Sequence, residues 1–165
     1  MQIRVRNTAA VMYEDEFRRL HTGLGLPMLL TEEVINEWGA DVVFEGPQAT
    51  GGTVYQYSMR SGVREIEGKW YTNYILGPVF TDREATETEP AQTAAEQETA
   101  YKAMKDAEQA KSVRTSRTEK LKDCDWTQIA DSTADKTAWA TYRQALRDIT
   151  GQAGFPWTIT WPDAP

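Results

Sequence analysis

The sequence has very little of what most enzymes use for chemistry. Its 165 residues include one cysteine, Cys124, and one histidine, His21. A single cysteine excludes an internal disulfide and a zinc site made of a cysteine cluster, and a single histidine excludes His-rich metal sites. Phosphate-loop, dinucleotide-binding and nucleophile-elbow motifs are also absent. We therefore expect a protein that is not an enzyme and that holds no cofactor or metal ion.

Positive charge and long hydrophobic runs are scarce as well. The chain has 18 Lys and Arg against 25 Asp and Glu, a formal net charge of −7. This balance speaks against a protein that binds the phosphate backbone of nucleic acids. No run of 18 apolar residues occurs, so no membrane-spanning helix is expected. Residues 1–4 contain no apolar core, so no secretory signal is expected either.

Large aliphatic residues are few, and this limits the size of any core. Leu, Ile, Val and Phe make up 28 of the 165 residues. In chains of high net charge, so low a content of these residues is typical of disordered proteins. Six Trp and seven Tyr act in the opposite direction, because each buries a large area. We expect one well-ordered part and one thinly packed, solvated part.

Residues 1–80 alternate between short apolar stretches and turn signals. The pairs Ser61-Gly62 and Glu67-Gly68 favour hairpin turns, and residues 24–30 form an apolar loop. We interpret residues 1–80 as a small α+β domain with two short helices and an antiparallel sheet that includes a meander of three or four strands. The pattern predicts helices over 14–21 and from Thr31 to Gly39, and strands over 2–6, 41–45, 53–60, 63–66 and 69–76.

Composition changes at residue 81, and residues 81–93 have the character of a linker, without large apolar side chains over most of their length. Thr93 and Glu96 fit a capping box, and residues 94–122 contain neither Gly nor Pro. The sequence therefore predicts one long helix, with a narrow stripe of alanines that cannot anchor it to a core. Two interpretations stay open: a solvated helix, or a helix covered by a partner or by a second copy of the chain.

The last part, within a unit 94–165, predicts a helical hairpin and an extended tail. Ser132 begins a second candidate capping box, before a helix over residues 137–149. On this helix Trp139, Tyr142 and Leu146 recur at helical spacing, and we expect Trp126 to pack near Trp139.

In the tail, bulky residues alternate with Pro and Thr. An extended tail would place the bulky residues on one face, to be buried on the hairpin or in a partner's groove. The alternating residues are Phe155, Trp157, Ile159 and Trp161.

Several C-terminal motifs together resemble a known family. The matching stretches, in order, are Arg117–Leu121, Cys124–Gln128, Trp139–Asp148, Phe155-Pro156-Trp157 and Trp161-Pro162. Residues 117–165 are similar to the C-terminal module of bacteriophage tail fibre assembly proteins, also described as tail assembly chaperones. The resemblance implies binding rather than catalysis, with a tail fibre or baseplate protein as partner. It also implies a location in the host cytoplasm during assembly or in the virion tail.

The hypothesis is a non-enzymatic phage tail protein that binds the tail fibre, aiding its assembly or remaining attached to it. One alternative is a permanent structural component of the baseplate or fibre network, self-associating through residues 94–122. Another is a carbohydrate-binding receptor module that uses the N-terminal Tyr and Trp residues. The residues expected to pack the module or bind the partner are Trp126, Trp139, Tyr142, Leu146, Phe155, Trp157 and Trp161.

Overall fold

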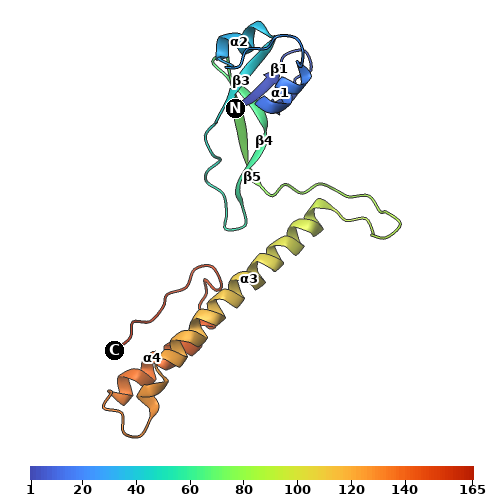
Figure 1. Cartoon of the computed structure of the whole chain (residues 1–165). Helices are drawn as coiled ribbons and strands as arrows, with labels where there is room; N and C mark the ends of the chain where they lie inside the picture. The colour runs from blue at the N-terminus through green and yellow to red at the C-terminus, as the bar shows by residue number, and fades with distance from the viewer. The chain divides into compact units, whose positions relative to one another are not determined.

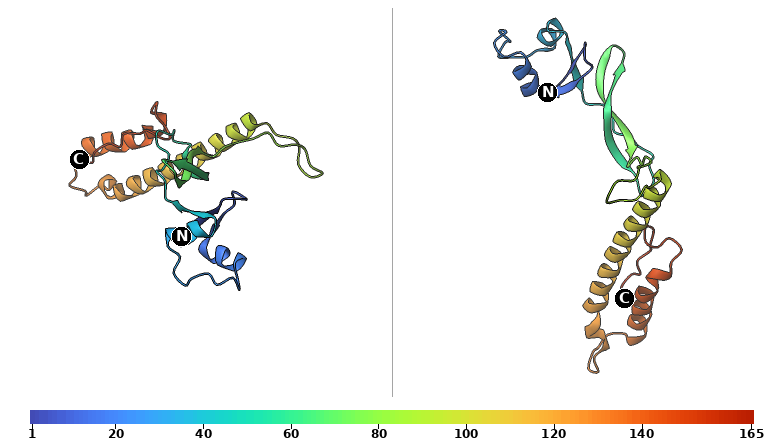
Figure 2. Two further views of the ribbon diagram at one scale, coloured as in Figure 1. Left: turned by 90° about the horizontal axis from the view of Figure 1, so that it is seen from above. Right: turned by 90° about the vertical axis from the view of Figure 1, so that its right-hand side faces the viewer.

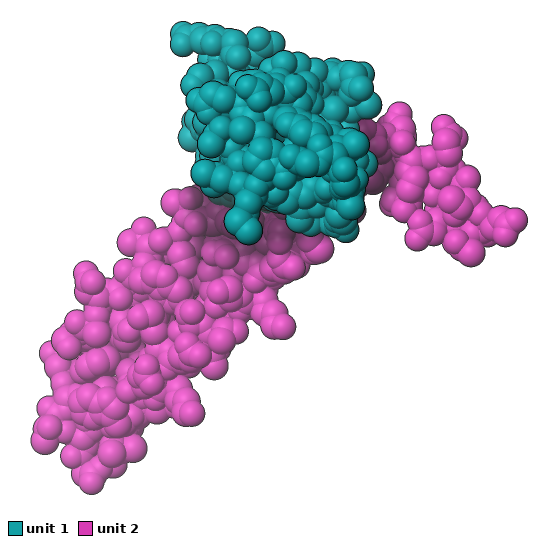
Figure 3. Space-filling view, turned by 45° about the horizontal axis from the view of Figure 1, so that its top comes forward, with its two compact units in different colours: residues 1–79 teal, residues 80–165 magenta.

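The computed structural model describes all 165 residues, which divide into two compact units. The first unit spans Met1–Val79 and the second spans Phe80–Pro165 (Figure 3). Each unit contains its own cluster of buried hydrophobic residues, so each has a core independent of the other.

The first unit is built on a five-stranded sheet with the strand order β2-β1-β3-β5-β4. β1 pairs antiparallel with both β2 and β3, and β4 pairs antiparallel with β5. β3 and β5 run parallel, with Val43 opposite Trp70 and Phe44 opposite Tyr71. The strands are β1 (Gln2–Val5), β2 (Val11–Tyr13), β3 (Ala40–Phe44), β4 (Tyr57–Ile66) and β5 (Lys69–Gly77) (Figure 1).

The expected α+β class is confirmed, but the sheet is not wholly antiparallel, because β3 and β5 form a parallel pair. The strands expected over 53–60 and 63–66 form the single strand β4, and β2 has no counterpart among the expected strands. The chain from β3 passes through a loop and β4 before β5 returns beside β3, and a connection of this length permits a parallel pair. The expected turn at Ser61-Gly62 is instead a shift of register inside β4, where Gly62 has a φ of 72°. The expected turn at Glu67-Gly68 is present, and it joins β4 to β5 in a long hairpin (Figure 2).

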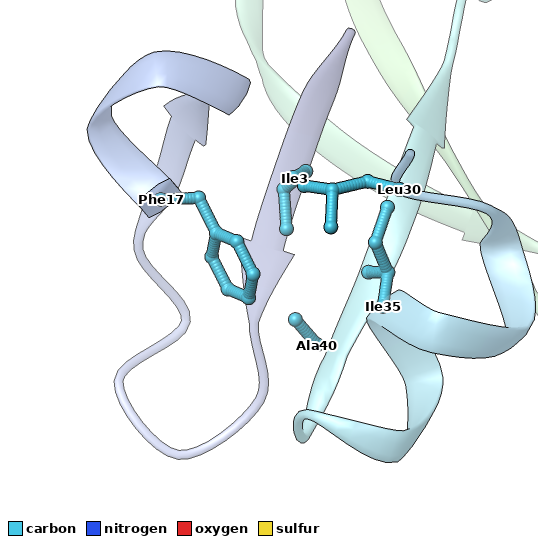
Figure 4. Packing of buried hydrophobic residues seen from close by; sticks show 5 residues of the cluster. All are labelled: Ile3, Phe17, Leu30, Ile35 and Ala40. Carbon is cyan, nitrogen blue, oxygen red and sulfur yellow. The ribbon is translucent and has the colours of Figure 1, made fainter. Parts of the chain in front are cut away.

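Two short helices pack against β1, β2 and β3 and complete the core of the first unit. They are α1 (Glu14–Leu20) and α2 (Glu32–Glu37), and the Thr31 hydroxyl caps α2 by accepting from the backbone N–H of Val34. Figure 4 shows side chains from both helices, from β1 and from the start of β3 pointing towards one another. The buried cluster consists of Ile3, Phe17, Leu30, Ile35 and Ala40.

The second unit is a helical hairpin preceded by an exposed loop. Its 30-residue helix α3 (Ala94–Asp123) is unbroken, and the expected capping box between Thr93 and Glu96 is present. A short 3-10 turn, η1 (Asp125–Gln128), leads to α4 (Lys136–Asp148), which returns along the second half of α3 (Figure 2). A second 3-10 turn, η2 (Ile149–Gly151), ends α4.

Local hydrogen bonding sets both the loop before α3 and the start of α4. Arg83 and Gln92 pair through their backbones within the loop, and Asp82 accepts from the backbone N–H of Ala94 at 2.7 Å. At α4 the cap is Asp135, whose carboxylate accepts from the backbone N–H groups of Thr137 and Ala138, at 3.0 Å each. The capping box expected to start at Ser132 is therefore wrong, because the cap lies three residues later.

Candidate functional site: the C-terminal helical hairpin

The hairpin closes around a small core contributed by both helices. Leu146 on α4 and Ile149 just after it have no exposed surface, and Val113 on α3 is 5% exposed. The stripe expected from the sequence is thus the inner face of α4, with Tyr142 buried and Trp139 half-buried at its edge. Burial raises the pKa of Tyr142 above its ordinary value, so its hydroxyl stays neutral at physiological pH.

Arg143 joins α4 to the end of α3, a role that the sequence pattern did not reveal. Its guanidinium donates to the backbone oxygen of Leu121 at 2.8 Å, to the sulfur of Cys124 at 3.0 Å and to the carboxylate of Asp125 at 2.8 Å. Burial alone would lower the pKa of Arg143, but the hydrogen bonds to Asp125 and Cys124 outweigh it and raise the pKa. Arg143 therefore remains a cation that holds the turn between the helices.

Replacing Arg143 with Met should reduce the free energy of unfolding of this unit by about 1.5–3 kcal/mol, since hydrogen bonds to charged groups are worth that much. The reason is that the part-buried Leu121 carbonyl loses its donor. Denaturant titration followed by circular dichroism measures the change. Arg147→Met, an exposed change on the same helix, is the control; equal stability losses in the two variants would contradict the assignment.

Thr127 holds the 3-10 turn in place from inside. Its side chain is fully buried, and its hydroxyl donates to the backbone oxygen of Cys124 at 2.7 Å. Gln128 donates in turn to that hydroxyl at 2.8 Å. A single buried threonine in a polar stretch has no periodic signal, so sequence reasoning did not single it out. Its inward position leaves the neighbouring side chain of Trp126 to face outwards.

Trp126 and Ile129 point outwards at the end of the hairpin, where the half-buried Trp139 lies beside Trp126. We call these three residues the aromatic tip. Trp126 is 54% exposed and Ile129 is 55% exposed. Trp126 packs edge-to-face on Trp139 with ring centroids 5.8 Å apart, as expected from the sequence, and Trp139 packs on Tyr142 at 5.5 Å. Trp126 and Ile129 are thus exposed to solvent, and the Trp126 ring rests on the packed rings of Trp139 and Tyr142.

The tail begins with a turn instead of the continuous extended segment expected from its alternation. Residues 153–157 form this turn, in which the backbone oxygen of Gly154 accepts from the N–H groups of Trp157 and Thr158. A side chain at position 154 would lie 2.1 Å from the Thr158 oxygen, so glycine permits this close approach. Only the residues after the turn run without regular hydrogen bonding to the end of the chain.

The tail packs on its own hairpin, the first of the two surfaces considered. Phe155, Ile159 and Trp161 pack against the buried cluster, while the Trp157 indole donates to Asp106 of α3. A glutamine fixes the tail through both atoms of its amide: Gln152 donates to the backbone oxygen of Thr160 at 2.8 Å and accepts from the N–H of the same residue at 2.7 Å. The three aromatic residues of the tail are each half-buried in these contacts.

The aromatic residues of the first unit are largely engaged by neighbouring side chains. The Arg4 guanidinium lies 3.7 Å from the centre of the Trp70 ring, and Tyr71 packs on Phe44 with ring centroids 5.7 Å apart. The Tyr74 hydroxyl donates to Glu45. These contacts engage Trp70, Tyr71 and Tyr74 within the protein, and no observation favours the carbohydrate-binding alternative.

No group of three or more His, Cys, Asp and Glu residues is placed to hold a metal ion. No helix has the length and apolarity that crossing a membrane requires.

Comparison with known proteins agrees with the resemblance seen in the sequence. Residues 110–165, about a third of the chain, match the family described as phage tail assembly chaperone protein. The match begins in the second half of α3 and includes the aromatic tip and the tail. No curated protein and no solved structure matches the chain. The C-terminal hairpin is therefore a module similar to phage tail assembly chaperone proteins, and the match supports a role in phage tail assembly.

Proposed function

We propose that this chain is a non-enzymatic phage tail protein that binds the tail fibre through the aromatic tip of its C-terminal hairpin. In this role it aids fibre assembly in the host cytoplasm or remains attached to the fibre in the virion. The observation that carries the proposal is the exposure of Trp126 and Ile129 on a turn whose backbone is fixed.

The support beneath the tip favours binding for a physical reason. Thr127, Arg143 and the Trp139 ring already hold the turn, so little conformational entropy is lost when a partner covers it. Tryptophan is also among the residues that most often dominate interface energies. By contrast, Tyr142 and Leu146 are buried, and they contribute by keeping the hairpin folded.

Changing Trp126 to Ala should weaken binding to the purified tail fibre protein by about 2 kcal/mol, which raises the Kd about 30-fold. The indole is more than half exposed, so its loss should cost little folding stability. Isothermal titration calorimetry measures the affinity. Met104→Ala, which removes a 47% exposed side chain of α3 away from the tip, is the matched control. An unchanged Kd for Trp126→Ala would contradict the proposal.

Self-association through residues 94–122 is a second element of the proposal. Ala110 is buried in the hairpin, whereas Ala100, Ala103 and Ala107 are exposed along α3. A second copy packing on this strip would favour a permanent structural component, and a monomer would favour a transient chaperone. Sedimentation velocity distinguishes the two, together with quantitative mass spectrometry of the chain in purified phage particles and in lysate.

A further inference from the structure

The end of α1 and the loop between α1 and α2 present large aliphatic side chains to solvent. Within residues 20–29, Leu20 and Leu24 are each 64% exposed, Leu29 is 74% exposed and Met28 is 97% exposed. Single exposed aliphatic residues are common on protein surfaces, but a concentration of them marks an interaction site. We call these four residues the loop patch.

The backbone that carries the loop patch is held on two sides. Inside, Leu30 is buried in the core of the first unit and Leu26 packs against it. Outside, the Arg18 guanidinium of α1 donates to the backbone oxygen of Pro27 at 2.9 Å and to that of Met28 at 2.6 Å. The exposed side chains therefore stand on an ordered backbone, so a partner loses less free energy in ordering the loop.

The charges around the loop patch are predominantly negative. Arg18 is paired with Glu14 at 2.9 Å and Arg19 with Asp15 at 2.7 Å, so each pair is neutral and Glu16 leaves α1 with a net negative charge. Glu33 follows the loop, and a hydrogen bond to a backbone N–H, with a second to the Thr31 side chain, lowers the pKa of its carboxyl. Glu33 therefore stays ionised at neutral pH, and Glu32 beside it has only a 4.0 Å contact with Lys69.

This combination selects one class of partner over the others. An apolar surface with an acidic border attracts a positively charged protein surface and repels anionic lipid headgroups. In a symmetric dimer formed through the loop patch, the acidic residues of one copy would face those of the other, and like charges repel.

We infer that the loop patch is a second docking surface, which takes a protein segment with an aliphatic or aromatic side chain flanked by Lys or Arg. The surface lies in the first unit, outside residues 110–165, and it gives the chain two separate binding sites. The inference rests on the proposed function only in taking this second partner from the phage tail.

The test uses the full chain and the double variant Met28→Ser with Leu29→Ser. Each tail protein of the same phage is purified singly and tested by biolayer interferometry. We expect the double variant to lose about tenfold or more in affinity for one tail protein. The wild-type affinity for that protein should also fall as salt is raised, because the border attraction is screened. The matched control is Val54→Ser, which removes an aliphatic side chain of the same unit that is 57% exposed.

The outcomes separate this inference from the proposed function. If Trp126→Ala weakens fibre binding while the double variant binds every tail protein as the wild type does, the inference is overturned and the function stands. Loss of binding to vesicles of anionic lipid in the double variant would overturn the protein partner in favour of a membrane. If the wild type is a dimer and the double variant is a monomer, the protein partner is overturned in favour of a second copy of this chain. An unchanged melting temperature shows that the double variant is folded, as expected for exposed positions.

Discussion

Replacing Leu146 with Ala should lower the free energy of unfolding of the C-terminal unit by about 2–5 kcal/mol. Leu146 has no exposed surface, and it packs among Tyr142, Ile149 and Val113 in a core of few residues. The lost burial and the cavity left behind both act against the folded hairpin. Denaturant titration followed by far-ultraviolet circular dichroism measures this unit in particular, because α3 and α4 contain 30 and 13 helical residues against 7 in α1 and 6 in α2.

The control for Leu146 is Ile129→Ala in the same unit. Ile129 is 55% exposed at the aromatic tip, so its truncation should change the stability by less than about 0.5 kcal/mol. The two variants together separate folding from binding: Leu146→Ala should lose the hairpin, whereas Ile129→Ala should keep the hairpin and bind the partner more weakly. A stable Leu146→Ala hairpin would show that the α4 stripe is not its core.

Replacing Phe17 with Ala should destabilise the first unit by about 3–5 kcal/mol. Phe17 is fully buried, and it is the only buried residue of α1, so it is the main attachment of this helix to the sheet. Its ring also packs against His21 with centroids 4.3 Å apart. Hydrogen exchange read by mass spectrometry reports the loss locally, as faster exchange in β1 and β3.

Leu20→Ala on the same helix is the comparison for Phe17. Leu20 is 64% exposed, and its truncation should leave exchange in β1 and β3 at the wild-type rate. Protection of β1 and β3 that survives Phe17→Ala would refute the core described for this unit. Because Phe17 also positions α1, we expect its loss to disorder the Arg18 contacts that hold the loop patch.

The parts of this protein that were predictable from sequence depend on contacts between residues close in the chain. The capping box of Thr93 and Glu96 and the buried stripe of α4 involve residues three or four positions apart. The hairpin turn at Glu67-Gly68 likewise needs only two residues with positive φ. Fold class and the C-terminal family resemblance followed from such local features together with a few large aromatic residues.

Long-range pairing was not predictable in the same way. The parallel contact of Val43 with Trp70 joins strands separated by a loop and a further strand, and neither strand carries a local signal of its direction. The same holds for Arg143, whose three acceptors lie 18 to 22 residues earlier. An arginine on a helix is expected to be a solvated charge until the chain brings those acceptors to it.

Sequence alone determined where most helices begin, which face of α4 is buried and which family the C-terminal module resembles, because hydrogen bonding and periodicity within a segment decide these. Tertiary structure alone decided the order of the strands in the sheet and the turn at the start of the tail. It also decided which large apolar residues are buried and which are exposed. Leu146 and Trp126 are both large and apolar, yet one is buried and the other is 54% exposed. The physical reason is that burial depends on which distant surfaces the folded chain brings to a side chain.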